Sequence, residues 1–459
     1  MTLPSPHFCA SALLLGGLAQ TMAGGVYWTD RASGQKAIRR MGFDGASPTT
    51  TTPFIALSAA DDPRGVALDV AAQKLYYGSG TQIVQANLDG TPASGKITGL
   101  TAVRDVRVRR DLGAILWCDE NANRVGRADL STLVTSGAPD WPKPASQAYY
   151  VDVAAPFGLV IWGGSGNNTI SAAPYSGGTT SIPLLSTGID ELRGVCFDPL
   201  SSAVFWCDRN NKVVRRATLA VTAGVPSLGA VTTLYSGLDA PHGLVLDSAA
   251  RKLYWVDSGA NSGVGTGDSG VTRGDMDAPT GPAEVLIGTT NAAAPPVTVF
   301  NGQPWDLDLD RRTPTYPEWV SRVFARNALT ATTDKTADPD ADGAPNWREY
   351  MLGTHPLRPD QPVYEPMIVA GPVTNSEHLA IKYRRRVGMT DAQIVPQFSN
   401  SLENWIDDEL FQPPVSFFVE VSKSPLPEDE GVEEVIVRKT TALTAGAPPT
   451  FMRLKLVTF

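Results

Sequence analysis

The chain has 459 residues, more than a single hydrophobic core usually serves, so we expect two or three domains. Glycine (43 residues) and proline (36) are abundant, and long apolar stretches of helical period are mostly missing, which favours short strands joined by turns. The formal net charge of -9 argues against nucleic acid or an anionic membrane surface as a partner.

Residues 1–23 read as a secretory leader. The apolar run from Phe8 to Leu18 is too short to span a bilayer, and small residues at Thr21 and Ala23 suit a signal peptidase. No second apolar stretch approaches spanning length, so we expect a secreted, periplasmic or cell-surface protein without a transmembrane segment once the leader is removed.

Three cysteines follow the leader: Cys118, Cys196 and Cys207. They are odd in number and too sparse for a disulfide framework. Cys196 and Cys207 could pair across one hairpin, or all three could be buried free thiols.

An aromatic strand pattern recurs six times after the leader. The segments are "VYWTD", "KLYYGS", "AILWCD", "LVIWGG", "AVFWCD" and "KLYWVD", with central residues Trp28, Tyr77, Trp117, Trp162, Trp206 and Trp255. The steps between these residues are 49, 40, 45, 44 and 49. A period of roughly 40 to 50 residues with one such strand per unit is typical of a radial array of four-stranded blades.

A second strand precedes each aromatic strand except the first. These inner strands are "PRGVALD", "VRDVRVR", "QAYYVD", "LRGVCFD" and "PHGLVLD". A sixth, "QPWDLDLD" at 303–310, is followed by no aromatic strand. We therefore predict that it completes the first unit, so that residues 24–312 form a six-bladed β-propeller closed by pairing of its N- and C-terminal strands. Closure would remove the exposed sheet edges.

The repeats resemble the YWTD propeller repeats (class B repeats) of the low-density-lipoprotein receptor family, through "VYWTD", "KLYWVD", "PRGVALD" and "NLDG". The resemblance implies a scaffold used for binding and supplies no partner. It also implies that the aspartates at Asp30, Asp119, Asp208 and Asp257 tie blades together through main-chain hydrogen bonds. Ser79 and Gly164 stand at this position in two units, so those two joints would be held differently.

Residues 313–360 change to a helical pattern and contain an acidic loop. Apolar residues recur at helical spacing at Trp319, Val320, Val323 and Phe324, and Pro317 suits a first turn. The following "DPDADGAPNWRE" matches the calcium loop of a helix-loop-helix hand, with Gly343 at the sharp turn. The predicted calcium ligands are Asp338, Asp340, Asp342, the carbonyl of Ala344, Asn346 and Glu349.

Alternate carboxylates at this spacing would converge on a hard cation, which would order the linker. The alternative is an acidic turn in solvent, since Asp and Gly are ordinary turn residues. The stretch "DPDADGAPNWREYMLGTHPLRPD" is also similar to the thrombospondin type 3 linkers of bacterial exported proteins.

Residues 361–459 contain six short strand-like segments and are predicted to form a small β-sandwich. "FSNSLENW" and "MRLKLV" resemble the terminal domain that follows such linkers in surface proteins. Surface attachment or secretion sorting is the hypothesis that this resemblance implies.

"GTGDSG" at 265–270 satisfies a dinucleotide fingerprint and contains a serine-protease "GDSG". The fingerprint needs a helix behind it, whereas "GVTRGDMD" continues as a strand. A flexible inter-strand loop explains the motif.

The first residues of the inner strands suggest a ring at one mouth of the central channel. The aligned residues are Arg64, Arg104, Gln147, Arg193, His242 and Trp305. Convergent cations could bind a carboxylate or an acidic peptide there. Local ion pairing is the alternative, because Asp61, Asp62, Asp190, Glu191 and Asp239 lie a few residues upstream.

These patterns favour an exported, non-enzymatic binding or scaffold protein whose propeller presents a surface to a protein or glycan. The alternative is a lactonase of the gluconolactonase type, in which a calcium ion sits in the channel. That chemistry needs an acid cluster, and only Asp105 and Asp306 approach the required position. A purely structural envelope role is a third reading, since a fold does not fix a function.

Overall fold

The computed structural model describes residues 24–50, 52–135, 141, 143–164, 166–176, 178–259, 269–277, 282–288, 298–300, 302–360, 364–373, 376–407, 416–426 and 429–459. The predicted leader and most of the "GTGDSG" motif lie outside these residues. In the described part of the chain, no helix is long and apolar enough to cross a membrane.

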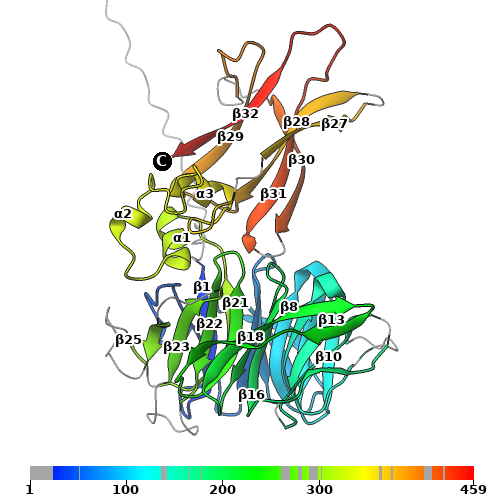
Figure 1. Ribbon diagram of the computed structural model, residues 1–459, viewed down its shortest axis with the longest axis vertical. Coiled ribbons are helices and arrows are strands. Elements are labelled where there is room, and N and C mark those ends of the chain that lie inside the picture. Colours follow the sequence, from blue (N-terminus) through cyan, green and yellow to red (C-terminus); the bar gives the residue numbers. More distant parts are fainter. Residues whose placement is uncertain are drawn as a thin grey trace, which may run out of the picture.

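Six sheets occupy residues 25–310 of the described chain, in the lower half of Figure 1. Neighbouring strands within each sheet are antiparallel, except that β24 and β25 are parallel. The first sheet contains β26 (Pro304–Asp310), β1 (Gly25–Asp30), β2 (Ala37–Met41) and β3 (Ile55–Ala56), and the second contains β4 (Pro63–Asp69), β5 (Lys74–Ser79), β6 (Gln82–Asn87) and β7 (Pro92–Ile97). The third contains β8 (Val103–Arg109), β9 (Ala114–Asp119), β10 (Arg124–Asp129) and β11 (Lys143–Pro144), and the fourth contains β12 (Ala148–Ala154), β13 (Leu159–Gly164), β14 (Thr169–Pro174) and β15 (Ile182–Leu185). The fifth contains β16 (Leu192–Asp198), β17 (Ala203–Asp208), β18 (Val213–Thr222), β19 (Val225–Leu228) and β20 (Thr232–Ser236), and the sixth contains β21 (Pro241–Asp247), β22 (Lys252–Asp257), β23 (Gly270–Asp275), β24 (Glu284–Gly288) and β25 (Thr298–Val299).

The first strand of each sheet contacts the first strand of the next sheet. The contacts run from β26 to β4, β8, β12, β16 and β21, and β21 contacts β26 again. Within the first sheet, β1 pairs with β26, which places Trp28 opposite Leu307 and Val26 opposite Leu309. The beginning and the end of the propeller segment are therefore ladder neighbours.

The aromatic residues of the second strands lie between sheets. Trp28, Trp162, Trp206 and Trp255 are fully buried. Trp28 shares a cluster with Tyr254 of the preceding sheet and with Leu307. Gly126 of β10 faces the indole of Trp117, and a Cβ at this position would overlap that ring. Buried rings such as Trp28 thus hold neighbouring sheets together, while Gly126 leaves room for the ring of Trp117 within its own sheet.

An aspartate ends several of these strands, and its carboxylate binds the loop that enters the same sheet. Asp119 accepts hydrogen bonds from the amides of Thr101 (3.0 Å) and Ala102 (2.8 Å). Where Ser79 replaces aspartate, its hydroxyl donates to Asp61 (2.8 Å) and accepts from the amide of Asp62 (3.4 Å). This joint is held differently, as the resemblance implied.

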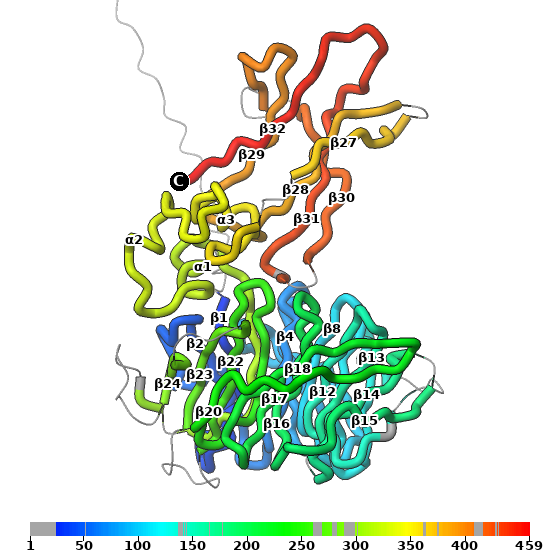
Figure 2. Tube along the Cα trace, viewed as in Figure 1, coloured from blue at the N-terminus to red at the C-terminus, as the bar shows by residue number. Residues whose placement is uncertain are grey.

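The helical segment consists of α1 (Tyr316–Val323), α2 (Thr330–Thr333) and α3 (Asn346–Leu352), between the propeller and the C-terminal strands (Figure 2). Thr315 and Glu318 form a capping box at α1. Trp319 and Tyr350 share one buried cluster with Ala250 of the propeller and Ala392 of the C-terminal region. Helices α1 and α3 are therefore part of a common core rather than an extended spacer.

The C-terminal region contains two sheets. One is formed by β27 (Tyr364–Ala370), β28 (Glu377–Arg386), β31 (Asp429–Lys439) and β30 (Phe418–Leu426), and the other by β29 (Ala392–Ser399) and β32 (Phe451–Thr458). Tyr383 and Val435 of the first sheet share a buried cluster with Phe398 of the second. Each of the six segments expected to be extended overlaps one of these strands.

The three cysteines after the leader are buried free thiols. Cys196 and Cys207 lie on the paired strands β16 and β17 without being register partners, since Cys196 faces Phe205 and Cys207 faces Arg193. The Sγ of Cys196 donates to the carbonyl of Leu244 (2.8 Å).

Candidate functional site

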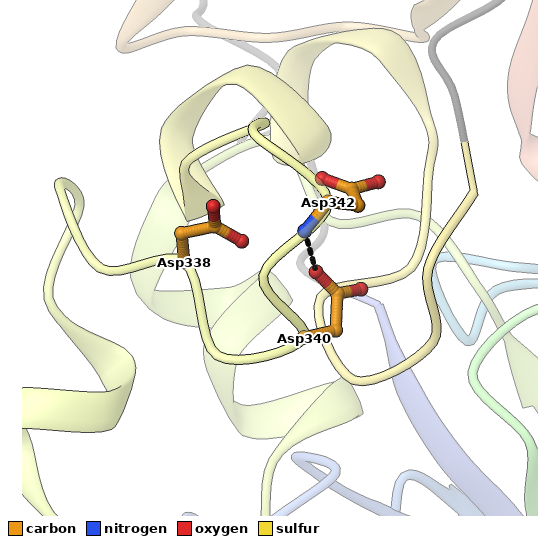
Figure 3. A group of neighbouring side chains, drawn as sticks. All are labelled: Asp338, Asp340 and Asp342. Atoms are coloured by element: carbon orange, nitrogen blue, oxygen red, sulfur yellow. Dashed lines mark hydrogen bonds between the residues drawn. The ribbon is translucent and has the colours of Figure 1, made fainter.

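The predicted calcium loop is a tight acidic turn before α3 (Figure 3). Asp338 accepts from the amide of Gly343 (3.0 Å), Asp340 from that of Asp342 (3.3 Å), and Asp342 from that of Ala344 (2.7 Å). Gly343 has φ +93, which suits glycine at the turn. Carboxylate oxygens of Asp338, Asp340 and Asp342 lie within 4.8 Å of one another. Hydrogen bonds from backbone amides to carboxylates also occur in an acidic turn that binds no metal, so these bonds by themselves do not indicate a calcium site.

Glu349 and Asp360 bring two more carboxylates to this loop. Ligand atoms of Asp342, Glu349 and Asp360 lie within 4.8 Å of one another. Glu349 is fully buried, and its Oε2, like Oδ2 of Asp340, has no hydrogen-bond partner. Burial, followed by repulsion from Asp340 and Asp342, raises the pKa of Glu349 to about 9. Buried, unsatisfied carboxylate oxygens in an acidic cluster are the donor set that a hard cation requires.

Asn346 and Ala344 complete the predicted set. Asn346 is fully buried, and its Nδ2 donates to the carbonyls of Thr332 and Asp334, both at 2.8 Å. Its Oδ1 has no hydrogen-bond partner. Ala344 is also buried. Asp360 was missed from the sequence because it lies beyond the twelve-residue loop; its amide donates to Asp342 (3.1 Å).

The arginines predicted to ring a channel mouth form local ion pairs. Arg64 pairs with Asp62 (2.8 Å), Arg193 pairs with Glu191 (2.6 Å), and Arg104 pairs with Glu120. The pairs with Asp62 and Glu191 are those that the sequence predicts as the alternative to a ligand site, because these acids lie just upstream of Arg64 and Arg193.

Several of these side chains also stack on one another. The ring of Trp305 lies under the guanidinium groups of Arg31 (4.2 Å) and Arg64 (4.7 Å) and 3.9 Å from the ring of His242. His242 accepts a hydrogen bond from Nε of Arg193 (3.2 Å). Burial and the charge of Arg193 hold the pKa of His242 well below its usual value, so this ring is neutral at pH 7.

The strand register corrects one member of the predicted ring. In β8 and β12, the ladder skips one residue at a bulge, and these residues are Arg104 and Tyr149. Tyr149, rather than Gln147, is therefore equivalent to Arg104. Gln147 lies before the strand, is exposed and has φ 47. The ring of Tyr149 lies 4.1 Å from the guanidinium of Arg193 and 5.4 Å from that of Arg104.

Below the mouth, carboxylates of the first strands bind the backbone of the next sheet. Asp105 accepts from the amide of Val151 (2.9 Å), and Asp306 accepts from the amide of Val66 (3.1 Å). Arg107 lies 3.5 Å from Asp105 and 3.9 Å from Asp306. Burial raises the pKa of Asp105 to about 6 and holds that of Asp306 well above its usual value, so burial disfavours ionisation of both carboxyl groups.

Two further carboxylates repeat this arrangement. Asp152 accepts from the amide of Phe197 (2.8 Å), and Asp308 accepts from the amide of Leu68 (2.9 Å). These side chains satisfy amides at the inner edges of the sheets, which would otherwise be buried without a partner.

No protein-family model matches the chain. It is similar to low-density lipoprotein receptor-related protein 5 of Mus musculus (31% identity over 78 residues) and to protein cueball of Drosophila willistoni (28% over 102 residues). These alignments cover 17% and 20% of this chain but only 5% and 15% of the relatives' lengths. With the sheet arrangement, they support a β-propeller.

Solved structures with a similar backbone include a nidogen/laminin complex (16% identity, TM-score 0.46, 62% of this chain and 98% of that chain). A gluconolactonase from Xanthomonas campestris is also similar (14% identity, TM-score 0.39, 54% of this chain and 79% of that chain).

Proposed function

We propose that the six sheets are the blades of one closed six-bladed propeller of the YWTD type, and that the protein is an exported, non-enzymatic binding scaffold. The cycle of contacts between first strands and the pairing of β1 with β26 support closure. The similarity to receptor-related protein 5 supports a role in protein binding, and a glycan is the other partner class that we consider. The predicted leader supports a secreted, periplasmic or surface location.

The observation that carries the binding proposal is the excess of guanidinium groups at the channel mouth. Among the described residues, five arginines there hydrogen-bond or pair with three carboxylates: Arg31 and Arg64 share Asp62, Arg193 and Arg209 share Glu191, and Arg104 pairs with Glu120. Burial and the neighbouring charges of Arg31 and Arg104 lower the pKa of Arg64. A carboxylate of an acidic partner would relieve this repulsion, and the faces of Trp305 and Tyr149 would add stacking surface.

The test uses poly-L-glutamate as the probe and isothermal titration of the full chain. We expect Arg64→Ala combined with Arg193→Ala to weaken binding at least about tenfold while the variant keeps its fold, as judged by near-ultraviolet circular dichroism. Arg385→Ala, in an ion-paired arginine of the C-terminal region, is the matched control and should bind like the wild type. A lower melting temperature with unchanged binding would show that the mouth arginines are only structural.

We further propose that the acidic loop holds a structural calcium ion. The ligands would be Asp338, Asp340, Asp342, the carbonyl of Ala344, Asn346 and Glu349, with Asp360 as an additional carboxylate. The unpartnered buried oxygens of Asp340, Asn346 and Glu349 support this proposal. The ion would supply no reaction chemistry; it would neutralise the acidic groups and fix α3 against the loop.

The lactonase alternative is less well supported by the channel. Asp105, Asp152, Asp306 and Asp308 each already accept an amide of the next sheet, and Arg107 occupies the space beside two of them. Hydrolysis of gluconolactone by the purified chain, lost on Asp306→Asn, would overturn the binding proposal in favour of this alternative.

The C-terminal sheets, which we propose form a β-sandwich, would attach the protein to the surface or sort it for secretion. Unchanged secretion and location after removal of residues 361–459 would count against this role.

A further inference from the structure

A cavity of about 270 Å³ lies where the propeller, the helical segment and the C-terminal sheet meet. Its lining includes Ala250 of the propeller, Arg322 of α1, Asp360 after α3, and Arg384, Arg386 and Asp429 of the C-terminal strands. The lining therefore brings three guanidinium groups and two carboxylates into one partly open space, and the partners of these groups decide what that space can bind.

Arg322 is fully satisfied by carboxylates. Its Nε and Nη2 each donate to Asp247 at 2.7 Å, and its Nη1 donates to both oxygens of Asp429 at 3.1 and 3.2 Å. Asp429 also accepts from the amide of Gly431 (2.9 Å). These two carboxylates are therefore committed to Arg322.

Arg386 has no carboxylate partner among the described residues. It is 3% exposed, its Nε donates to the carbonyl of Tyr350 (2.7 Å), and its Nη1 donates to Oγ1 of Thr313 (3.0 Å). Both acceptors are uncharged. Burial, aided by repulsion from Arg322, outweighs the attraction of Asp429 and lowers the pKa of Arg386 to about 10. A buried cation in this state is stabilised by an added negative charge.

Arg384 is also without an anionic partner within the described chain. Its Nε is buried and has no hydrogen-bond partner. Glu434 lies opposite Arg384 in the ladder but pairs with Lys382 (3.6 Å). Arg384 and Arg386 are two residues apart on β28, so both side chains project from the same face of the strand, about 7 Å apart.

We propose that this cavity is a binding site for a small oxyanion, a carboxylate or sulfate-like group held by the guanidinium groups of Arg384 and Arg386. Planar guanidinium groups present paired N–H donors that match the oxygens of such an anion. The site is separate from the channel mouth, and its occupant would neutralise buried positive charge at the junction of the three parts.

The test measures binding of sodium sulfate and sodium malonate to the full chain by isothermal titration, with sodium chloride at matched ionic strength as reference. We expect saturable binding of both oxyanions, accompanied by a rise in melting temperature, and at least about tenfold weaker binding in Arg384→Gln. Arg385→Gln is the matched control, because this neighbour projects from the opposite face and pairs with Glu433 (2.7 Å).

The proposal holds if Arg384→Gln loses binding while Arg385→Gln retains it. It is overturned if the wild type shows no saturable oxyanion binding, or if Arg384→Gln binds as tightly as Arg385→Gln. Arg384→Lys covers the case in which Arg384→Gln does not fold, as judged by near-ultraviolet circular dichroism. It keeps the charge and loses the paired donors, so affinity equal to the wild type would also contradict the proposed geometry.

Discussion

Replacing Arg322 by methionine tests the junction between the propeller and the two regions that follow it. Arg322 and Asp247 have side chains that are 1% and 0% exposed, and they form a bidentate pair with Asp429 as the second anion. The variant leaves two buried carboxylates without their cation. Breaking a buried pair in this way costs about 3–5 kcal/mol, so we expect a loss of that size in unfolding free energy at pH 7.

The pH dependence of this loss follows from Asp247. Although burial opposes it, Arg322 holds the pKa of Asp247 at about 2, below the ordinary value of 3.8. A depressed carboxyl pKa contributes stability that is present above the unfolded value and is lost as the pH falls through the folded value. The shift corresponds to roughly 2 kcal/mol. The difference in unfolding free energy between the wild type and Arg322→Met should therefore decrease by roughly 2 kcal/mol as the pH falls from 5 to 2.

Urea unfolding followed by tryptophan fluorescence measures the effect, with Trp319 reporting from the same cluster. Adding Asp247→Asn to Arg322→Met removes one of the stranded charges, so the double variant should be more stable than the single one. Arg385→Met is the control for loss of a more exposed ion pair. A loss below about 1 kcal/mol in Arg322→Met, or a double variant that is no more stable, would refute the reasoning.

Three other perturbations test the loop, the packing and the closure. Millimolar calcium should raise the melting temperature of the wild type in calorimetry, and Glu349→Gln should remove most of that rise, because it removes a ligand charge. Gly126→Ala should lower the unfolding free energy by about 1–3 kcal/mol, since its methyl group overlaps the ring of Trp117. Trp28→Ala and Leu307→Ala, which face each other across the terminal ladder, should show a coupling energy of about 0.5–3 kcal/mol in a double-mutant cycle.

Each of these tests has a control and a contrary outcome. Glu403→Gln, at an exposed acid, should leave the effect of calcium on the melting temperature unchanged. Superimposable calorimetric traces of the wild type with calcium and with chelator would contradict the calcium site. Gly229→Ala, whose Cβ meets only ordinary contacts, should be near neutral, and equal losses at both glycines would contradict the packing argument. Strict additivity of the Trp28 and Leu307 losses would argue against closure through these strands.

The aromatic strands and the inner strands were predictable because their signals are local. A buried residue such as Trp255 lies in a short run of apolar and β-branched residues that repeats along the chain. The error at Gln147 came from aligning sequence motifs alone. The ladder places Val151 opposite Trp162 as it places Val66 opposite Tyr77, so Tyr149 and not Gln147 is equivalent to Arg64. Register depends on how two strands pair, which a single strand's sequence does not specify.

Contacts between residues far apart in the sequence could not be predicted either, because they also depend on how separate segments pack together. Asp360 reaches the acidic loop only because the chain turns back after α3, where Gly353 has φ +71. Arg322 and Asp247 are 75 residues apart and belong to regions that the sequence divided into separate units. The predicted linker was assigned from its helical spacing, which says nothing about the surface it packs against.

The packing of α1 on the propeller limits how the molecule can be divided. In a chain that ends at residue 312, Asp247 would lack its ion-pair partner Arg322. Arg273 would lose its hydrogen bonds to the carbonyls of Ser321 and Phe324. The apolar surface around Ala250 would be exposed to solvent. The propeller alone would expose this apolar surface and contain a buried carboxylate without its cation. A transfer of this propeller to another protein would therefore have to include α1.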